Sequence, residues 1–408
     1  MNVIFRVVLL TFAGVLIYAM SAGIRNNYGI MLHSIIDSSG TSFASVSFVL
    51  AVGQLIFGLV QPLFGIMAAK KGNVSVLVSG IALMLVGMVL TPLCKSIAPL
   101  ILCLGFILPA GTGALSYGII MGTLTPKIPP RSVSAVSGIV NASSGVGNTA
   151  LSPVINSLIR TGGLMHGMLV LAVPLSLMLP VSLWMGKKDK KQVRSGENLS
   201  PSSSSHLAED RVNIKAMFQR ALKSKTYIYL MLGFFTCGFH MALITNHLPT
   251  QIRSFGFSPE AVAYAFSVYG VATIVGSVLS GSLCGKFKMK NVLGFYYGLR
   301  PITILLFLVV PKTLPTVTLF TALFGFSGAA TVPPVSGIIN RVFGAGSIAT
   351  LYGLVFFVHQ IGGFFGAWFA GICFEATKSY TAVWTAAIVF GIAASAVSLA
   401  IKETESDR

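Results

Sequence analysis

The chain has 408 residues, of which 54% are hydrophobic and 9% are charged, with a formal net charge of +18. Soluble globular proteins carry about 25% charged residues, so this chain lacks the residues to cover a globular surface in water. The composition therefore excludes a soluble protein and predicts one that crosses a lipid bilayer many times. A strongly basic chain can bind nucleic acid. Here, however, Lys and Arg gather in alternate loops between apolar segments, so we expect no nucleic acid partner.

Twelve apolar segments follow one another along the chain, most of them about 20 residues or longer, which is the length at which a helix spans hydrocarbon. The predicted fold class is therefore an all-α membrane protein with twelve transmembrane helices. The first segment is long and has no small-residue cleavage pattern, so we expect a retained helix and not a signal peptide. The segments lie at 5–33, 43–68, 74–94, 98–124, 133–159, 164–185, 226–250, 259–284, 291–310, 314–340, 348–374 and 379–401.

Lys and Arg gather in alternate loops. If the N-terminus is cytoplasmic, the loops and tails on that side hold 21 of these residues and the loops on the other side hold five. Cytoplasmic loops carry such an excess. We therefore expect a multi-pass protein of the cell inner membrane with both termini in the cytoplasm.

A polar stretch separates the sixth and seventh segments. Its serine-rich middle, "SPSSSS", is typical of a flexible linker, and the basic "IKAMFQRALKSK" that follows predicts a short helix on the membrane surface. We predict an N-terminal six-helix bundle at 1–186, a cytoplasmic linker at 187–225 and a C-terminal six-helix bundle at 226–408.

The two predicted bundles repeat each other. "SVSAVSGIVNASSGVG" (132–147) aligns with "SIATLYGLVFFVHQIG" (347–362) at an offset of 215, which pairs Gly147 with Gly362. The same offset pairs Gly23 with Gly238 and places Arg25 opposite His240. Such a duplication is typical of transporters whose two halves rock about a central binding site.

The loops after the second and eighth segments, "GIMAAKKGN" and "GSLCGKFKMKN", resemble the basic loop motif of the major facilitator superfamily. The acidic residue of that motif is absent from both copies, with Ala69 and Gly285 near its place. The resemblance extends to the twelve segments and the long central loop. It implies two pseudo-symmetric six-helix bundles, secondary transport by alternating access, and a monomer.

Several stretches resemble monocarboxylate carriers and oxalate/formate antiporters more closely, among them "AGIRNNYGIML", "NHLPTQIRSFGFS", "YYGLRPI" and "LVFFVHQIGGFFGAWFAG". In the monocarboxylate carriers a Lys in helix one and an Arg in helix eight are tied to the substrate. Arg25 falls where that Lys would be, whereas Ser277 stands about where the Arg would be. The resemblance implies that the substrate is a small organic anion, such as a monocarboxylate.

Arg25 and Arg300 are the two basic residues inside predicted helices. The guanidinium of Arg25 could snorkel to the outer surface, or it could bind an anionic oxygen pair through its fork of donors. Arg300 precedes Pro301, and a structural role and a coupling role both stay open for it.

Three histidines lie in predicted helices. His240 and His247 are seven residues apart and share a face, and His359 follows Tyr352 on a similar stripe. An imidazole in a cavity can bind substrate or carry a proton near neutral pH, whereas a neutral His can also serve as a hydrogen bond between helices. We expect His240 and His359 to line one cavity with Arg25. The candidate substrate-binding residues are Arg25, Asn27, Tyr28, Tyr117, Asn141, His240, His247, Tyr352, His359 and Gln360.

All ten acidic residues fall in loops, helix ends or tails. Carriers of cations usually present a membrane carboxylate, so we expect a neutral to positive cavity that favours anions. A proton or a counter-anion would couple transport. Efflux of a larger amphipathic compound, such as a siderophore or drug, and a non-transporting receptor with the same fold are the alternatives.

The residues that would support an enzyme are not recognisable in the sequence. The five cysteines are scattered without a CxxC pair, which indicates free thiols and no metal site. No GxxxxGK[ST] loop for nucleotide phosphates is present. We therefore expect no cofactor and no catalytic residues, and the lipid bilayer and a small-molecule substrate as the partners.

Overall fold

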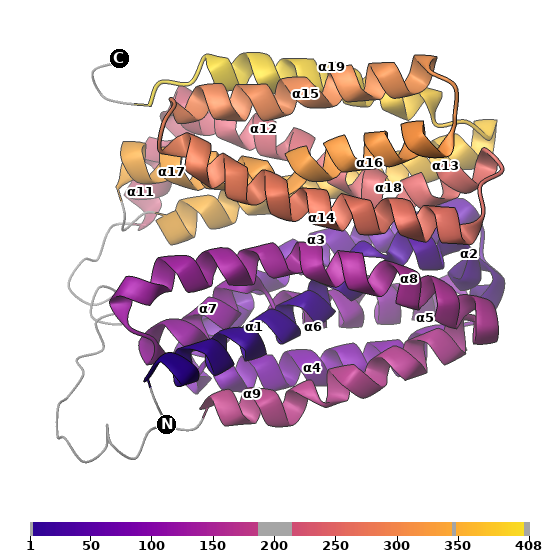
Figure 1. The fold of residues 1–408 in the computed structure, drawn as a ribbon, viewed down its shortest axis with the longest axis horizontal. Helices are drawn as coiled ribbons and strands as arrows, with labels where there is room; N and C mark the ends of the chain where they lie inside the picture. The colour runs from indigo at the N-terminus through magenta and orange to yellow at the C-terminus, as the bar shows by residue number, and fades with distance from the viewer. Residues whose placement is uncertain (1–2, 187–213, 345–347, 404–408) are drawn as a thin grey trace.

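The computed structural model describes residues 3–186, 214–344 and 348–403, and within them the regular elements are all helices. Most of the predicted linker, 187–213, lies outside the described residues. The long helices run side by side, and α1 begins at the same end of the molecule at which α19 ends (Figure 1). We call this end the terminal face and the other end the opposite face.

The first half contains nine α-helices and three shorter helical turns among the described residues. They are α1 (Val3–Asn26), α2 (Tyr28–Ser39), α3 (Phe43–Lys71), α4 (Asn73–Leu90), η1 (Thr91–Leu93), α5 (Ile97–Leu100), η2 (Ile101–Ile107), α6 (Leu108–Ala114), α7 (Tyr117–Leu124), η3 (Thr125–Lys127), α8 (Pro130–Ser176) and α9 (Met178–Gly186).

The second half begins with the short helix that the basic segment predicts. Its elements are α11 (Ile214–Lys223), α12 (Lys225–Ala242), η5 (Leu243–His247), α13 (Leu248–Ser254), α14 (Pro259–Cys284), α15 (Met289–Val309), α16 (Leu314–Gly328), η6 (Ala329–Thr331), α17 (Val332–Phe343), α18 (Ile348–Thr377) and α19 (Thr381–Leu399).

Eleven stretches of the described chain are long and apolar enough to cross a membrane, and one of them, Val136–Gly186, has 51 residues. A straight helix of that length would measure about 75 Å at 1.5 Å per residue, more than twice the roughly 30 Å of bilayer hydrocarbon. The chain turns at Gly163, whose φ of 71° favours glycine. Its two arms cross separately, which confirms the predicted twelve crossings.

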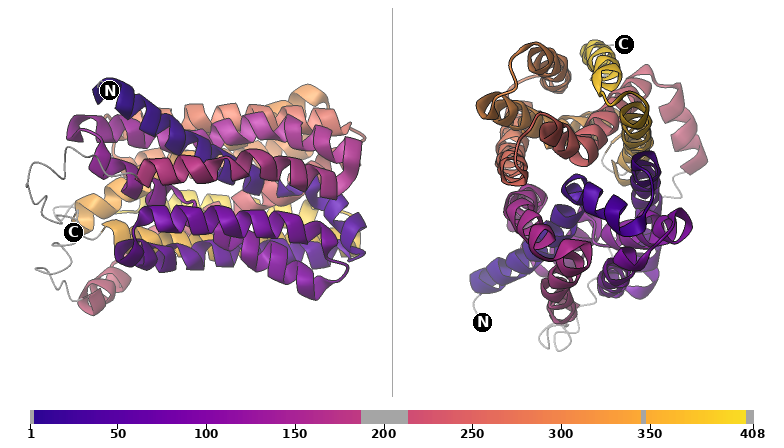
Figure 2. Two further views of the ribbon diagram at one scale, coloured as in Figure 1. Left: turned by 90° about the horizontal axis from the view of Figure 1, so that it is seen from below. Right: turned by 90° about the vertical axis from the view of Figure 1, so that its right-hand side faces the viewer.

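The two halves of the chain have separate apolar cores. The first half buries residues such as Ile17, Leu104 and Val140 in one cluster, and the second half buries Phe324 and Tyr227 in separate clusters. Viewed along the helices, the two bundles lie one above the other (Figure 2). Each bundle therefore has its own core, as expected for two pseudo-symmetric units.

The sequence repeat corresponds to a repeated helix crossing. In the first half α1 meets α8 so closely that a Cβ on Gly147 would lie 2.0 Å from the carbonyl oxygen of Ala19. In the second half α12 meets α18, and a Cβ on Gly362 would lie 1.9 Å from the carbonyl oxygen of Phe235. Small residues allow such close backbone approach in membranes. The glycines paired at offset 215 therefore permit the same close helix crossing in both halves.

Five spans leave the α-helical pattern inside the membrane stretch, and one of them, span six, breaks at Leu177 between α8 and α9. Span one breaks between α1 and α2, and span seven contains the wide turn η5 between α12 and α13. Span four contains η2, and span ten contains the tight turn η6 before Pro333 and Pro334. These interruptions free backbone hydrogen-bonding groups, which must find other partners in a bilayer.

We predict that Gly362→Ala destabilises the protein, because its Cβ would collide with the backbone of α12. Overpacking of this kind costs about 1–3 kcal/mol. The matched control is Gly353→Ala in the same helix, where a Cβ would meet no atom within 4 Å. Thermal unfolding of the purified protein in detergent measures both. Equal midpoints for the two variants would contradict the close crossing.

Candidate functional site

A cavity of about 160 Å³ lies between the two halves. Side chains reach it from α1, α3 and α8 of the first half and from α12, α14, η6 and α18 of the second. Arg25 is the one lining residue of the described chain with a permanent charge. The polar residues around the cavity are Tyr18, Arg25, Asn26, Gln54, Ser144, Asn148, Cys237, Thr245, Tyr269, Thr273, Thr331, His359 and Gln360.

Arg25 lies in the interior of the first span, because α1 and α2 together run from Val3 to Ser39. Its guanidinium carbon is 4.1 Å from the centre of the Phe57 ring of α3, a cation–π contact that partly offsets its desolvation. Arg25 stands in the last turn of α1, but α2 continues the span beyond it, and the Arg25 side chain lines the cavity. This geometry disfavours the interpretation that Arg25 snorkels to the outer surface.

Arg25 has no carboxylate partner among the residues that the structure describes. The acidic residues in this part of the chain lie at the ends of helices, where Glu403 accepts from Arg341 at 2.8 Å and Glu260 pairs with Arg160. The cavity therefore carries an uncompensated positive charge, as the sequence predicts. The described acidic residues are Asp37, Glu260, Glu375 and Glu403.

His359 and Gln360 reach the cavity from α18. The imidazole is stacked on Phe356 with ring centres 5.6 Å apart, and the edge of Phe234 lies at the same distance. His359 Nδ1 and Gln360 Oε1 are buried without a hydrogen-bond partner in the described chain. Since buried polar atoms are almost always hydrogen-bonded, these two atoms are available to bond with a ligand in the cavity.

His240 lies elsewhere, contrary to the expectation that it lines the cavity with Arg25. It is fully buried, and its Nε2 is 2.8 Å from the carbonyl oxygen of Ala387 in α19. His247 is likewise buried, with Nε2 2.8 Å from the carbonyl oxygen of Ala367 in α18. Both imidazoles act as hydrogen bonds between helices, because their face of span seven points toward neighbouring helices and away from the cavity.

Asn27 fills the break in span one. Its side chain donates to the carbonyl oxygen of Gly23 at 2.7 Å and accepts from Ser152 Oγ at 2.7 Å. It also donates to Asn148 Oδ1 at 3.3 Å, and Asn148 lines the cavity. Asn27 therefore does not line the cavity but holds the lining residue Asn148 in place through a hydrogen bond.

The other candidates do not line the cavity. Tyr28 is buried, and Tyr117 bonds to Ser137. Asn141 donates to Ser277 Oγ at 3.3 Å across the two halves. The ring of Tyr352 packs against Phe234 with centres 6.0 Å apart. Tyr352 therefore contacts a residue that lines the cavity.

Sequence reasoning missed several lining residues, including Tyr18, Gln54, Cys237 and Tyr269. One signal was present for Tyr18, which stands seven residues before Arg25 and therefore on the same helical face. The others stand alone in apolar stretches, and their direction depends on how each helix is rotated in the bundle.

Arg300 is fully buried in α15 and serves the interruption of span ten. Its Nη2 donates to the carbonyl oxygens of Ser327 at 2.7 Å and Gly328 at 3.3 Å, and Nε donates to Ser327 Oγ at 3.3 Å. Ser327 and Gly328 end α16, where carbonyl groups lack helical partners and the helix dipole is negative. Arg300 therefore caps a helix end inside the membrane.

We predict that Arg300→Gln lowers the stability of the protein, because carbonyl oxygens at the end of α16 lose a charged donor. Hydrogen bonds to charged groups contribute about 1.5–3 kcal/mol each, so a loss of several kcal/mol is expected, with a smaller loss for Arg300→Lys. Thermal unfolding in detergent is the measurement. A normal midpoint for Arg300→Gln, with transport abolished, would instead assign Arg300 to coupling.

The sequence model of the Major Facilitator Superfamily matches residues 12–258 and 230–408. The chain belongs to this superfamily. Rat monocarboxylate transporter 13 is 25% identical over 392 residues, which cover 94% of this chain and 86% of that protein. An uncharacterized transporter of the superfamily from Bacillus subtilis, YcxA, is 27% identical over 179 residues, covering 42% of this chain and 43% of YcxA.

Solved structures show the same fold. A D-xylose–proton symporter superposes with a TM-score of 0.75 at 12% identity, and the match covers 99% of both chains. A bacterial homolog of the human lysosomal transporter Spinster superposes with a TM-score of 0.72 at 16% identity, over 98% of both chains. The protein is thus a multi-pass membrane transporter for a small-molecule substrate and not an enzyme.

Proposed function

We propose that this protein is a secondary active transporter that moves a small organic anion of the monocarboxylate class by alternating access. The observation that carries the proposal is the position of Arg25, a cation without a carboxylate partner in the described chain, on the wall of a cavity shared by both halves. The names of the monocarboxylate transporters to which the chain is similar agree with this substrate class.

The energetics of Arg25 favour an anionic ligand. A charge at the bilayer centre costs roughly 2.5–3.5 kcal/mol on insertion scales, and the ring of Phe57 offsets only part of it. A carboxylate would accept two parallel N–H bonds from the guanidinium fork. The substrate would thereby supply the counter-charge that the described chain does not provide.

The size of the cavity favours a small substrate over a large amphipathic one. The cavity has a volume of about 160 Å³. Pockets for drug-sized ligands measure about 300–1,000 Å³. Efflux of a siderophore would require a much wider cavity.

Transport by alternating access requires the halves to separate at one end. At the opposite face the helices touch closely: a Cβ on Gly29 would lie 2.3 Å from the carbonyl oxygen of Thr245, and one on Gly371 would lie 2.2 Å from Ser47 Cβ. These contacts join α2 to η5 and α3 to α18. In our proposal they form the closed gate and part when the cavity opens to that side.

We also propose how the protein is oriented in the membrane and what drives transport. Both termini are cytoplasmic, the membrane is the cell inner membrane, and the halves at 1–186 and 226–408 move about the linker at 187–225 in a monomer. A proton or a counter-anion drives transport, and His359 is the cavity residue suited to carry a proton.

We predict that Arg25→Gln weakens substrate binding by about tenfold or more, because 1.4 kcal/mol is a factor of ten and the charged hydrogen bonds exceed that. Arg25→Lys keeps the charge without the fork and should give an intermediate affinity. Uptake of a three-carbon monocarboxylate into proteoliposomes with matched amounts of protein is the measurement.

The control for charge removal is Arg253→Gln, which changes an exposed cation outside the cavity. The neutral amide of the same compound should not compete in any variant. Equal affinity of wild type and Arg25→Gln, or equal competition by the amide, would contradict an anion site at Arg25.

The two histidines should differ in what their loss affects. His359→Gln should reduce uptake with little change in the unfolding midpoint, because the ring lines the cavity. His240→Leu should lower the midpoint, because the interhelical hydrogen bond to the carbonyl oxygen of Ala387 is lost, at a cost of about 0.5–1.5 kcal/mol. Uptake by the folded fraction and thermal unfolding, measured on both variants, separate the roles. The reverse pattern would place the functional imidazole at His240.

A further inference from the structure

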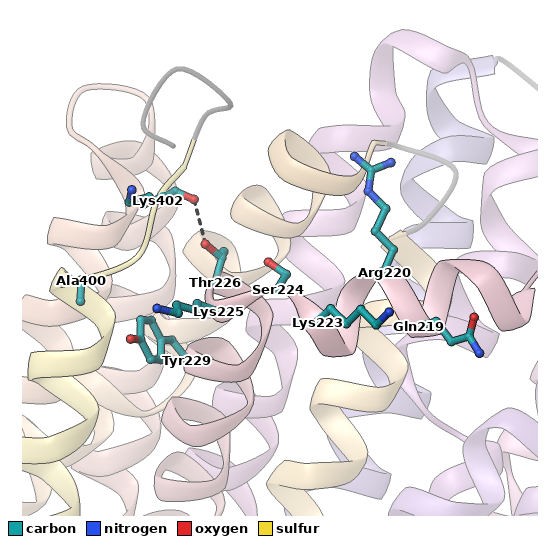
Figure 3. A pocket seen from close by; sticks show the side chains of 9 residues that line it. All are labelled: Gln219, Arg220, Lys223, Ser224, Lys225, Thr226, Tyr229, Ala400 and Lys402. Carbon is teal, nitrogen blue, oxygen red and sulfur yellow. Dashed lines mark hydrogen bonds between the residues drawn. The ribbon is translucent and has the colours of Figure 1, made fainter.

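A second, larger cavity lies at the terminal face. It has a volume of about 830 Å³ and lies between α11, the start of α12 and the segment that follows α19 (Figure 3). Arg220 and Lys223 come from α11, Lys225 begins α12, and Lys402 comes from the other side. Segments separated by almost 180 positions thus bring four basic residues to one pocket.

The charge of this pocket is one-sided. Its lining residues in the described chain include no acidic side chain. Glu403 follows Lys402 directly, but it is 3% exposed and accepts from Arg341 at 2.8 Å and from the backbone N–H of Lys290. Its carboxylate is therefore committed to the inner side of the bundle, and the lysines of the pocket keep their positive field.

The position of the pocket matches the level of lipid headgroups. The membrane span that contains α12 begins at Lys225, which is itself a lining residue. Helix α11 packs Met217 and Ala221 against the core of the second half, while Gln219 and Lys223 are exposed and Leu222 is 48% exposed. Short amphipathic helices with basic polar faces lie in the membrane interface and bind anionic lipids.

From this geometry we propose that the pocket binds the headgroup of an anionic phospholipid. Lys223 and Lys225 point in opposite directions in Figure 3, and in our proposal their side chains turn to contact the phosphate together with Lys402. The hydroxyl groups of Ser224 and Tyr229, which also line the pocket, are further donors for phosphate oxygens. A donor set of this kind would also attract a soluble phosphate, but the pocket lies where the span begins and beside the exposed Leu222. The acyl chains of a bound lipid would contact the exposed Leu222 and the apolar start of the span, which a soluble phosphate cannot do.

A lipid in this place would tie α11 to the second half. Thr226 Oγ1 already donates to the carbonyl oxygen of Lys402 at 3.0 Å (Figure 3), which fixes the segment after α19 against α12. A phosphate that contacts Lys223 and Lys402 adds a second link across the same cavity. Helix α11, which already packs against the core of the second half, would then be held more firmly in anionic membranes.

The test uses the full-length protein in detergent and measures bound lipid by native mass spectrometry. Short-chain phosphatidylglycerol should bind better than phosphatidylcholine with the same chains, and the preference should weaken as salt increases. The combined variant Lys223→Gln, Lys225→Gln and Lys402→Gln should lose at least about tenfold in affinity for phosphatidylglycerol. The corresponding triple Lys→Arg variant should retain it.

The matched control removes three exposed lysines from the same face, Lys70, Lys71 and Lys286, and should bind like wild type. Equal binding of the two lipids, or an unchanged affinity in the pocket variant, would overturn the proposal. Glycerol phosphate and inorganic phosphate are measured in parallel by their effect on thermal unfolding. If either soluble phosphate raises the unfolding midpoint as much as phosphatidylglycerol does, the site binds soluble phosphate and the lipid assignment is wrong.

Discussion

Hydrocarbon offers no hydrogen bonds, and this one constraint organises the interior of the protein. Wherever a span leaves the α-helix, the freed carbonyl and N–H groups need side-chain partners. Spans one, four, seven and ten are each interrupted within the membrane stretch. At span one the partner is Asn27, and at span ten Arg300 donates to the carbonyl oxygens of Ser327 and Gly328. Some polar residues that the sequence suggests for substrate binding therefore serve as hydrogen-bond partners of backbone groups.

The two intramembrane arginines show how partners decide the role of a charge. Arg300 has two carbonyl oxygens and a hydroxyl within hydrogen-bonding distance, and each bond of a charged group contributes about 1.5–3 kcal/mol. That is enough to offset the roughly 2.5–3.5 kcal/mol that insertion of the charge costs. Arg25 has the face of Phe57 and a cavity in front of it. Arg300 thus has protein acceptors for Nε and Nη2, although its Nη1 has no partner in the described chain, whereas Arg25 faces a cavity that a ligand can enter.

The fold could be predicted because its signals are local and additive. Length and apolarity located the spans, and the offset of 215 between Gly147 and Gly362 predicted a repeat that the structure shows as two similar crossings. The residues of the cavity were harder. His240 and His359 are both single imidazoles in apolar helices, and nothing in their neighbourhoods says that one faces Ala387 of the last helix while the other faces the cavity. That choice depends on the rotation of each helix, which the packing of the whole bundle sets.

Four of the interrupted spans, one, four, seven and ten, recur at every third position, and this spacing connects the backbone to the proposed transport cycle. Three of the four, spans one, seven and ten, supply residues to the cavity. Arg25 stands two residues before the break at Asn27, and Asn27 is linked through Asn148 to the carbonyl oxygen of Phe266 in the other half at 2.8 Å. A ligand that pulls on Arg25 therefore acts beside a point where the α-helix is interrupted and where hydrogen bonds join the two halves. Because a broken helix bends there at less cost than an intact one, the place that binds the substrate is also a place where the two halves can change their angle.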